Sequence, residues 1–336
     1  MPKSLNEPKS YVLLVHGFKT SSILTASIRR TNYACKAESA QWALGVKSDF
    51  RQMPQWLIDD GFVPFIAYYD SNPNTTPSNE TNAKCLRRQL IQVARQSPTG
   101  KVIIIAHSMG GLVIRAYLDG PAYKADVEAH GGELVECAFF LGTPNQAMAH
   151  HWLLVLNLNC ARNPRQRGAY EFSSKKFMAE FNQRFKHTNT NIPYYLIGGI
   201  QSSGAIGMLS NTYIAMVWGA NDGICPADSA TTLEGAFQTA VVEESHMGTV
   251  GQPSYFDPRP GNRYSHAYAD CIRPVLVDGD PLGCKTNVTP RRTIPWWMYP
   301  VTLVAYCLFY FFSVFRYLRH QVVDYFEKQS PVQEGT

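Results

Sequence analysis

Charged residues are scarce in this chain of 336 residues. Asp, Glu, Lys and Arg make up 17% of it, whereas hydrophobic residues make up 45%. The sequence has no block of Lys and Arg and no basic stripe interleaved with aromatic residues, and its formal net charge is only +5. These absences argue against nucleic-acid binding. A low charge fraction at this length indicates a large buried core or contact with a membrane.

Paired cysteine motifs are also missing. The eight cysteines are spread singly, without a Cys-x-x-Cys pair, which argues against a zinc ribbon or a redox motif. In a long chain, such cysteines are usually free and buried. The best candidate disulfide is Cys271 with Cys284, because a short loop rich in Pro and Gly separates them, and this bond would require an oxidising compartment. We expect no metal site and no cofactor.

The two ends of the sequence differ in character. The apolar run 11–15 is too short for a signal peptide, and no small-residue cleavage site follows it. Residues 293–315 carry no charge, and about 20 apolar residues span the ~30 Å hydrocarbon core of a bilayer. Trp296 and Trp297 lie where an interfacial aromatic belt would be. We therefore predict a transmembrane helix at 293–316, with a buried core helix as the alternative.

Between these ends, short apolar strand patterns alternate with helical patterns, and no internal repeat is present. Strands are expected at 11–15, 62–69, 102–106, 134–141, 194–198 and 239–243. Helices are expected at 81–96 and 112–118. Continuous apolar strands separated by helices are typical of a mostly parallel central sheet that is covered by helices on both faces. The fold class is therefore α/β.

One segment interrupts this alternation and indicates a helical cap insertion at about 150–190. It contains an apolar run and then four phenylalanines at helical spacing, Phe172, Phe177, Phe181 and Phe185. These side chains could line an acyl pocket, serve as a lid, or pack a helical pair on the core. The domain organisation that we expect is a catalytic domain at 1–277, a linker at 278–292, the transmembrane helix at 293–316 and a C-terminal tail at 317–336.

The sequence Ala106-His107-Ser108-Met109-Gly110 lies where a strand pattern turns into a helical one. A serine at such a corner takes a strained backbone conformation, and its neighbours must be small so that strand and helix can approach. Ala106 and Gly110 hold the flanking positions of the G-x-S-x-G pattern. We interpret Ser108 as a nucleophile on an elbow, with His107 packed beneath it. An ordinary glycine-containing turn is the alternative.

A nucleophilic serine requires a base and a carboxylate that orients the base. His246 is the predicted base, because it lies on a loop after a strand pattern, whereas its rival His266 lies in a helical pattern. Asp222, on an Asp-Gly turn 24 residues before His246, is predicted to orient the imidazole. Asp228 is a nearby rival, and a simple turn is the alternative for this Asp-Gly pair.

The reaction also requires donors for an oxyanion. The Met109 backbone N–H, directly after the serine, is one candidate. His16-Gly-Phe18 closes the first strand, and we predict that the Phe18 N–H is the second donor. The His16 imidazole is expected to bond loop backbone.

Five motifs in chain order carry a family resemblance: VHGF, AHSMGG with the helix LVIRAYL, LGTPNQA, NDGICP and SHMG. Over roughly residues 11–251, the sequence resembles α/β-hydrolases of the bacterial triacylglycerol lipase type. This resemblance implies an α/β-hydrolase fold and a carboxylic-ester hydrolase with Ser108, Asp222 and His246 as its triad. It also implies that the strand after the elbow helix ends at LGTP. A C-terminal anchor without a signal peptide departs from the secreted members, which weakens triglyceride as the substrate more than ester hydrolysis.

We therefore expect a membrane-anchored serine hydrolase that cleaves carboxylic esters of lipid or other hydrophobic substrates through an acyl-enzyme. Its partners would be that substrate and the membrane, without nucleic acid. A deacylase or thioesterase acting on lipid-linked or protein-linked acyl groups would use the same triad. A catalytically silent, membrane-tethered binding module is the alternative from another class.

The orientation in the membrane is not set by charge. Four Lys or Arg residues lie within 20 residues before the apolar segment and three lie after it. The missing signal peptide favours a cytosolic catalytic domain, in which the cysteines stay reduced. The sequons at Asn74, Asn79 and Asn287 matter only if the domain is lumenal.

Overall fold

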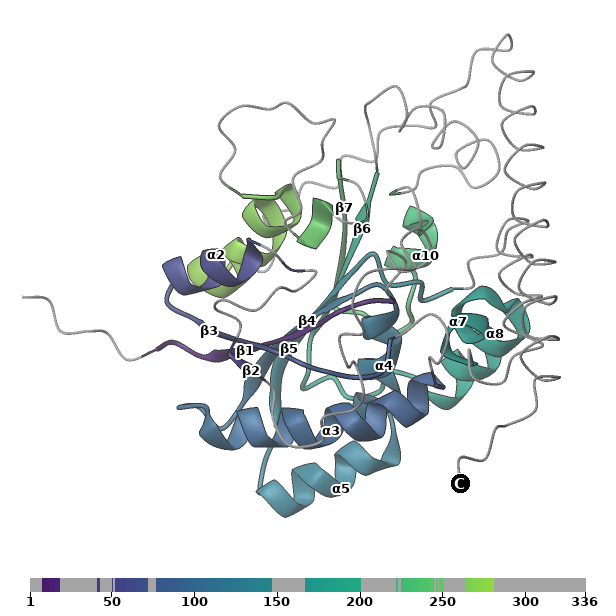
Figure 1. The fold of residues 1–336 in the computed structure, drawn as a ribbon, viewed down its shortest axis with the longest axis horizontal. Coiled ribbons are helices and arrows are strands. Elements are labelled where there is room, and N and C mark those ends of the chain that lie inside the picture. The colour runs from purple at the N-terminus through teal and green to yellow at the C-terminus, as the bar shows by residue number, and fades with distance from the viewer. Residues whose placement is uncertain are drawn as a thin grey trace, which may run out of the picture.

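The computed structural model describes residues 8–18, 41–42, 50, 52–71, 77–146, 167–200, 222, 225–244, 246, 248–250 and 264–280. Within these ranges, seven strands form one sheet in the order β2-β3-β1-β4-β5-β6-β7 (Figure 1). The strands are β1 (Tyr11–Val15), β2 (Gln41–Trp42), β3 (Val63–Ile66), β4 (Val102–His107), β5 (Val135–Leu141), β6 (Tyr194–Gly199) and β7 (Gln238–Val242). The edge strand β2 pairs antiparallel with β3, and the other neighbours pair in parallel.

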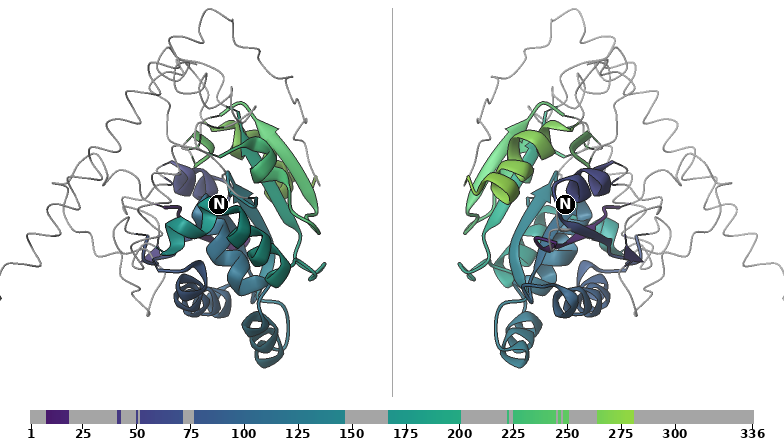
Figure 2. Two further views of the ribbon diagram at one scale, coloured as in Figure 1. Left: turned by 90° about the vertical axis from the view of Figure 1, so that its right-hand side faces the viewer. Right: turned by 90° about the vertical axis from the view of Figure 1, so that its left-hand side faces the viewer.

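Helices cover both faces of this sheet (Figures 1 and 2). The described α-helices are α2 (Met53–Asp59), α3 (Asn79–Gln96), α4 (Met109–Leu118), α5 (Pro121–His130), α7 (Arg167–Ser173), α8 (Lys175–Arg184) and α10 (Ala227–Thr231). A 3-10 turn η2 (Gly248–Val250) and two π-helical turns, η3 (Ala267–Ile272) and η4 (Pro274–Asp278), follow β7. The expected mostly parallel α/β sheet with helices on both faces is confirmed.

Alternation along the strands divides the core into two layers. In β1, Leu13 and Val15 face the layer that contains α3, α4, α7 and α8. Val12 and Leu14 face the other layer, which α2 and η3 complete. The same period of two runs through β4, where every residue is buried. A strand buried on both faces reads as a continuous apolar run, which explains why these strands were visible in the sequence.

Capping explains where α3 begins. The Ser78 side chain accepts a hydrogen bond of 3.1 Å from the Thr81 N–H, so the helix starts at Asn79, two residues before the predicted start. Its apolar stripe, with Leu86, Leu90 and Val93, is buried against the sheet as the spacing predicted. The predicted strand 62–69 is shorter in the structure, because only Val63–Ile66 pairs with β1.

The cysteines correct one expectation. Cys137 and Cys225 are free and buried. Cys85 and Cys271 are each disulfide-bonded. The expectation of a free thiol is therefore wrong for Cys85, whereas Cys271 was expected in a disulfide. Cys284, the predicted partner of Cys271, lies outside the described ranges, and that pairing stays a prediction.

No helix in the described ranges combines the length and apolar character needed to cross a bilayer. The predicted transmembrane helix at 293–316 lies outside these ranges, as do the linker from residue 281 on and the tail at 317–336. The first part of the predicted cap, residues 150–166, and the sequons at Asn74 and Asn287 also lie outside them.

Candidate active site

Ser108 stands at the corner between β4 and α4. Its φ of 53° makes it the only non-glycine residue with positive φ among the described residues, a conformation that costs energy for a side chain with a Cβ. Its N–H donates to the Leu141 carbonyl at 2.9 Å, which ties the corner to the end of β5. From residue 102 to residue 118, every residue except Ser108 is buried. The corner therefore presents one side chain, the serine, to the outside.

Glycines allow three segments to meet at this corner. A Cβ on Gly17 would lie 2.7 Å from the Ser108 Cβ, so the chain after β1 passes directly beside the serine. A Cβ on Gly110 would overlap the His16 carbonyl, and one on Gly111 would overlap the Thr143 side chain. The elbow is thus packed against the ends of both β1 and β5 at backbone distance.

This packing predicts the effect of one methyl group. We expect Gly110→Ala to lower the free energy of unfolding by at least about 2 kcal/mol, because the clash is with backbone, which does not rotate away. Gly132→Ala is the control, since Gly132 is exposed and has no atom within 4 Å of such a Cβ. It should change stability by less than about 0.5 kcal/mol. Urea denaturation measures both, and equal effects would show that the elbow is not tightly packed.

Asp222 and His246 form a buried pair. His246 Nδ1 donates to Asp222 Oδ2 at 2.6 Å, and the His246 N–H donates to the Asp222 carbonyl at 2.8 Å. The other carboxylate oxygen, Oδ1, accepts from the Cys225 N–H at 2.6 Å. With Nδ1–H held by the carboxylate, Nε2 is the ring nitrogen that can take up a proton. Asp222 lies after β6 and His246 after β7, at the same end of the sheet as Ser108.

The elbow and this pair are joined through His107. Its Nε2 donates to the His246 carbonyl at 2.9 Å, and the two rings lie 4.5 Å apart. Burial, together with the nearby His246 ring, lowers the pKa of His107 well below its usual value. His107 is therefore a neutral support beneath the site. Thr249 Oγ1 donates to the same His246 carbonyl at 2.8 Å.

One oxyanion candidate follows the serine directly, and the other belongs to the segment after β1 that passes beside it. Met109 is the first residue of α4, where backbone N–H groups have no partner within the helix. Phe18 is half-buried, and Gly17 brings its segment to the Ser108 Cβ. His16 Nδ1 bonds the Gly17 carbonyl at 3.0 Å, so the imidazole bonds loop backbone as expected. Stacking of His16 on Tyr69, at 4.4 Å between ring centroids, fixes this loop further.

The rival residues are engaged differently. Asp228 is exposed on α10, and the His246 Nδ1 is already bonded to Asp222. His266 Nδ1 bonds Asp270 Oδ2 at 2.9 Å at the start of η3. Among the described residues, no group of three or more His, Cys, Asp or Glu side chains could hold a metal ion.

Three residues that hold the pair were not predicted from the sequence. Cys225 acts through its backbone N–H, which any residue type carries, so its identity gives no signal. Thr249 is an ordinary threonine in a short turn. Only Gly142 could have been found from the sequence, because a glycine directly after an apolar strand indicates a positive φ or a close approach, and its φ is 55°. A Cβ there would lie 2.8 Å from Asp222 Oδ2 and 2.9 Å from His246 Nδ1.

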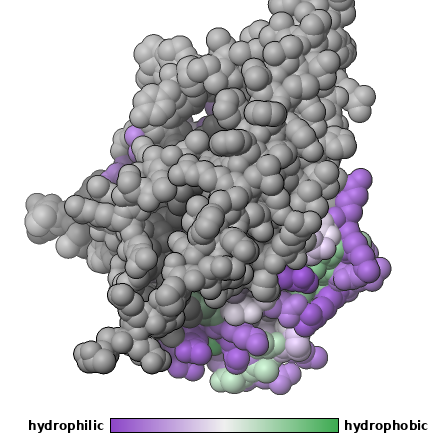
Figure 3. Space-filling model, turned by 45° about the vertical axis from the view of Figure 1, so that its right-hand side comes forward, coloured by the Kyte–Doolittle hydropathy of each residue, from purple (hydrophilic) through white to green (hydrophobic). Residues whose placement is uncertain are grey.

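The described part of the cap is a helical pair that packs on the core. Phe172, Phe181 and Phe185 are buried in the same layer as α3 and α4, and Phe177 is half-buried against it. The opposite face of α8 carries exposed Lys175, Lys176, Glu180 and Arg184. On the face drawn in Figure 3, the coloured surface is mostly hydrophilic, with smaller apolar areas. Phe172 also contacts Phe18, with ring centroids 5.8 Å apart.

A buried carboxylate fastens α7 to α3. Glu171 Oε2 accepts from the Asn79 N–H at 2.8 Å and from Asn79 Nδ2 at 2.9 Å, and Arg167 lies 3.3 Å from Oε1. Burial raises the pKa of Glu171 to about 7, against the opposing effect of these donors. Asn79 is itself fully buried, so the sequon that begins at this residue is closed to a glycan in the folded chain.

The raised pKa of Glu171 predicts a pH dependence of stability. Between its unfolded pKa of about 4.3 and its folded pKa of about 7, the folded state keeps a proton that the unfolded state has released. The free energy of unfolding therefore falls as pH rises through this window, by about 4 kcal/mol at 1.36 kcal/mol per pKa unit. Urea denaturation of wild type and Glu171→Gln from pH 4 to 8 should show this slope in wild type only.

Glu128→Gln, which removes an exposed carboxyl from α5, is the matched control and should follow the wild type. Parallel curves for wild type and Glu171→Gln would contradict the assignment.

The strand order, the serine after β4, the carboxylate after β6 and the histidine after β7 together define the α/β-hydrolase fold. Solved structures agree. The lipase BlEst2 of Bacillus licheniformis in its propeptide form matches with a TM-score of 0.52 and 17% identity, over 88% of this chain and 53% of that chain. This chain therefore spans about half the length of that protein.

Two further structures match with lower TM-scores. The mature form of BlEst2 gives 19% identity and a TM-score of 0.47, over 72% of this chain and 85% of that chain. Lipase 1 from Pelosinus fermentans gives 12% identity and a TM-score of 0.46, over 74% of this chain and 94% of that chain. Structurally, the neighbours are bacterial lipases and esterases of the α/β-hydrolase superfamily. No protein-family model and no curated protein matches the sequence.

Proposed function

We propose that the chain is a serine hydrolase that cleaves carboxylic esters through an acyl-enzyme. Ser108 Oγ attacks the ester carbonyl while His246 Nε2 takes the serine proton. His246 then gives this proton to the departing alcohol as the ester C–O bond breaks. Water, activated by the same imidazole, releases the acid and regenerates the serine. The observation that carries the proposal is a strained serine, alone among its buried neighbours, at the same end of the sheet as a buried Asp222–His246 pair that His107 contacts.

The backbone N–H groups of Phe18 and Met109 would stabilise the tetrahedral oxyanion. Two such donors placed in advance lower the barrier because they need no reorganisation when the charge develops, and losing one costs about 10²–10³ in rate. Support comes from the contact of Gly17 with Ser108 and from the position of Met109 at the start of α4. Asp222 would keep the imidazole in the tautomer that the reaction needs.

The substrate that we propose is a lipid or another hydrophobic ester. Two observations support this class. The half-buried Phe18 ring and the buried Phe172 ring that it contacts place aromatic side chains at the segment that carries the proposed oxyanion donor. In addition, the matched structure with the same fold is named a lipase.

The assay is hydrolysis of p-nitrophenyl esters from two to sixteen acyl carbons by the purified full chain, with an acyl thioester series alongside. Hydrolysis of the oxygen esters, favouring the longer chains, is the expected result. Faster cleavage of thioesters would favour a thioesterase, and a folded but inactive protein would favour a binding module.

We propose further that residues 293–316 anchor the chain in a membrane, on the strength of their length and apolar character. The anchor would hold the active site near hydrophobic substrate at the bilayer surface. An alkaline carbonate wash compares the full chain with a chain that ends at residue 292. We expect only the full chain to stay in the membrane fraction, and release of both would contradict the anchor.

The disulfides of Cys85 and Cys271 indicate on which side of the membrane the catalytic domain lies. Disulfides persist in oxidising compartments and are rare in the cytosol. We therefore propose that the catalytic domain faces an oxidising compartment, which reverses the cytosolic orientation expected from the sequence. Alkylation of acid-quenched cells, with and without reduction, tests this. Peptides with Cys85 and Cys271 should be alkylated only after reduction, and alkylation without reduction would restore the cytosolic orientation.

A further inference from the structure

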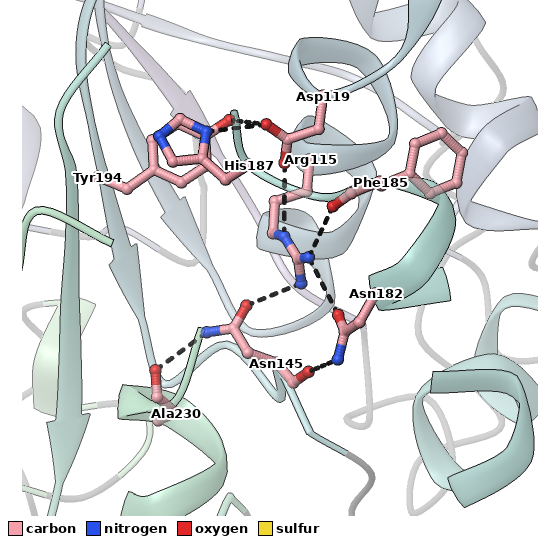
Figure 4. Close-up of polar contacts among 8 residues, drawn as sticks. All are labelled: Arg115, Asp119, Asn145, Asn182, Phe185, His187, Tyr194 and Ala230. Atoms are coloured by element: carbon pink, nitrogen blue, oxygen red, sulfur yellow. Dashed lines mark hydrogen bonds and ion pairs between the residues drawn. The ribbon is translucent and has the colours of Figure 1, made fainter. Parts of the chain in front are cut away.

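Asn145 is a fully buried residue whose four polar groups bond to three different elements (Figure 4). Its Oδ1 accepts from Arg115 Nη1 at 3.2 Å, and its carbonyl accepts from Asn182 Nδ2 at 2.8 Å. Its Nδ2 donates to the Ala230 carbonyl at 3.0 Å, and its N–H donates to the Ser229 carbonyl at 3.1 Å. The partners belong to α4, α8 and α10, so this residue joins the elbow helix, the cap and the helix that follows Asp222.

The bonds to α10 reach the Asp222 turn. Gln146 and Ser229 add a reciprocal pair, in which the Ser229 hydroxyl donates to the Gln146 carbonyl at 2.6 Å and accepts from its N–H at 3.2 Å. α10 starts only two residues after Cys225, whose N–H holds the Asp222 carboxylate. Gly142, three residues before Asn145, lies against that carboxylate from the other side. The loop after β5 therefore contacts the Asp222 carboxylate through Gly142 and contacts α10, which follows the Asp222 turn, through Asn145 and Gln146.

Arg115 anchors Asn145 to the elbow helix. Its side chain is fully buried in α4, a helix that begins directly after Ser108. Its Nη2 donates to Asn182 Oδ1 at 3.0 Å and to the Phe185 carbonyl at 3.1 Å. The Asp119 carboxylate, 3.7 Å from Nε, supplies the opposite charge. A buried guanidinium with this many partners has one geometry, so Asn145 is held in one place relative to the serine.

We propose that Asn145 is a positioning residue for Asp222. It fixes α10, and with it the Asp222 turn, to the helix that carries Ser108, so that the carboxylate stays at the distance from which it holds His246. Asn145 does not touch the reacting atoms, and the role rests on the proposed function. A catalytic group misplaced by about 1 Å can cost about 10²-fold in rate. Removing the hydrogen bonds of Asn145 should therefore affect kcat more than KM.

A double-mutant cycle tests the role. With a soluble p-nitrophenyl ester and the full chain, Asn145→Ala should lower kcat about 10- to 100-fold with KM within about twofold. In the Asp222→Asn background, the same substitution should cost less than about twofold, because a residue that acts through Asp222 has nothing left to position. Asn145→Asp is the second variant. It keeps the shape and the acceptor for Arg115, but it adds a negative charge and replaces the amide donor to the Ala230 carbonyl by a carboxylate oxygen. The bond to α10 is lost, so this variant should show the same pattern.

Gln89→Ala is the matched control. It removes another fully buried amide, which bonds the N–H and the carbonyl of Tyr68 after β3, whereas α10 contacts β6 and β7 at the other side of the sheet. Its kcat should stay within about twofold of wild type at a similar loss of thermal stability. Equal losses for Asn145→Ala in both backgrounds, or an equal kcat loss in Gln89→Ala, would overturn the role of Asn145. A folded wild type that hydrolyses no ester would instead overturn the proposed function.

Discussion

Replacing Ser108 by alanine should abolish ester hydrolysis, with kcat lower by about 10⁶-fold. The reason is that no other group at this corner can form the acyl-enzyme. His107 is neutral and engaged with the His246 carbonyl, and the flanking Met109 is buried. The measurement is kcat for a p-nitrophenyl ester at saturating substrate, on protein whose unfolding curve matches that of wild type.

Two further variants separate chemistry from folding. Ser97→Ala removes the serine at the end of α3, which lies before β4 whereas Ser108 lies after it, and should leave kcat unchanged. Ser108→Gly should abolish activity and raise the free energy of unfolding by about 1 kcal/mol, because glycine tolerates the positive φ that serine does not. Activity of Ser108→Ala within tenfold of wild type would contradict the assignment of Ser108 as the nucleophile.

Asp222→Asn should lower kcat by about 10⁴-fold and leave the fold intact. The amide keeps an acceptor for the Cys225 N–H, so the turn survives. When the amide oxygen of the substituted side chain accepts from the Cys225 N–H, the amide NH₂ group faces His246 Nδ1. This NH₂ group donates to Nδ1 and so favours the ring tautomer with its proton on Nε2. That tautomer is unable to take the serine proton. Kinetics at saturating substrate, together with the unfolding curve, measure both parts of this prediction.

Asp228→Asn is the control for this variant. Asp228 is exposed on α10, close to Asp222 in sequence, and its substitution should change kcat by less than about twofold. The opposite result, a large loss in Asp228→Asn and an active Asp222→Asn, would transfer the orienting role to Asp228.

The strands of the sheet could be predicted from the sequence because they are buried on both faces. β1 begins and ends at the predicted residues, and β4 and β6 differ from prediction by one residue. Three elements, β2, α2 and α5, were not predicted. α5 buries only Tyr123 and Asp126, so it has almost no apolar stripe to detect. β2 pairs through two residues only, which is too short for a period-two pattern.

The proposed site was readable where chemistry depends on residue type and hidden where it depends on backbone. Ser108, Asp222 and His246 were chosen by side chain and chain order, and the structure brings Asp222 and His246 within 2.6 Å. The supports that hold them act through N–H and carbonyl groups or through tertiary contacts between distant segments. Asn145 is an example, because its partners are 30, 37 and 85 residues away in the chain. No local pattern encodes such contacts.

The disulfide of Cys85 and the choice between a lid and a packed pair escaped prediction for a related reason. Single cysteines spread along a chain carry little pairing information, so Cys85 looked like a buried thiol, whereas the short loop before Cys284 made Cys271 a candidate for a disulfide. The helical spacing of the cap phenylalanines fits a lid and a packed pair equally, and only the burial of Phe181 and Phe185 against the core distinguishes them.

The most direct test of the central claim is to label the folded wild-type chain with a fluorophosphonate and to map the modified residue by peptide mass spectrometry. A nucleophilic serine displaces fluoride from the probe and keeps the phosphonyl group as a stable adduct. We expect one adduct per chain, on Ser108, and no adduct in Ser108→Ala. An unlabelled wild type that unfolds cooperatively, or an adduct on a different serine, would contradict it.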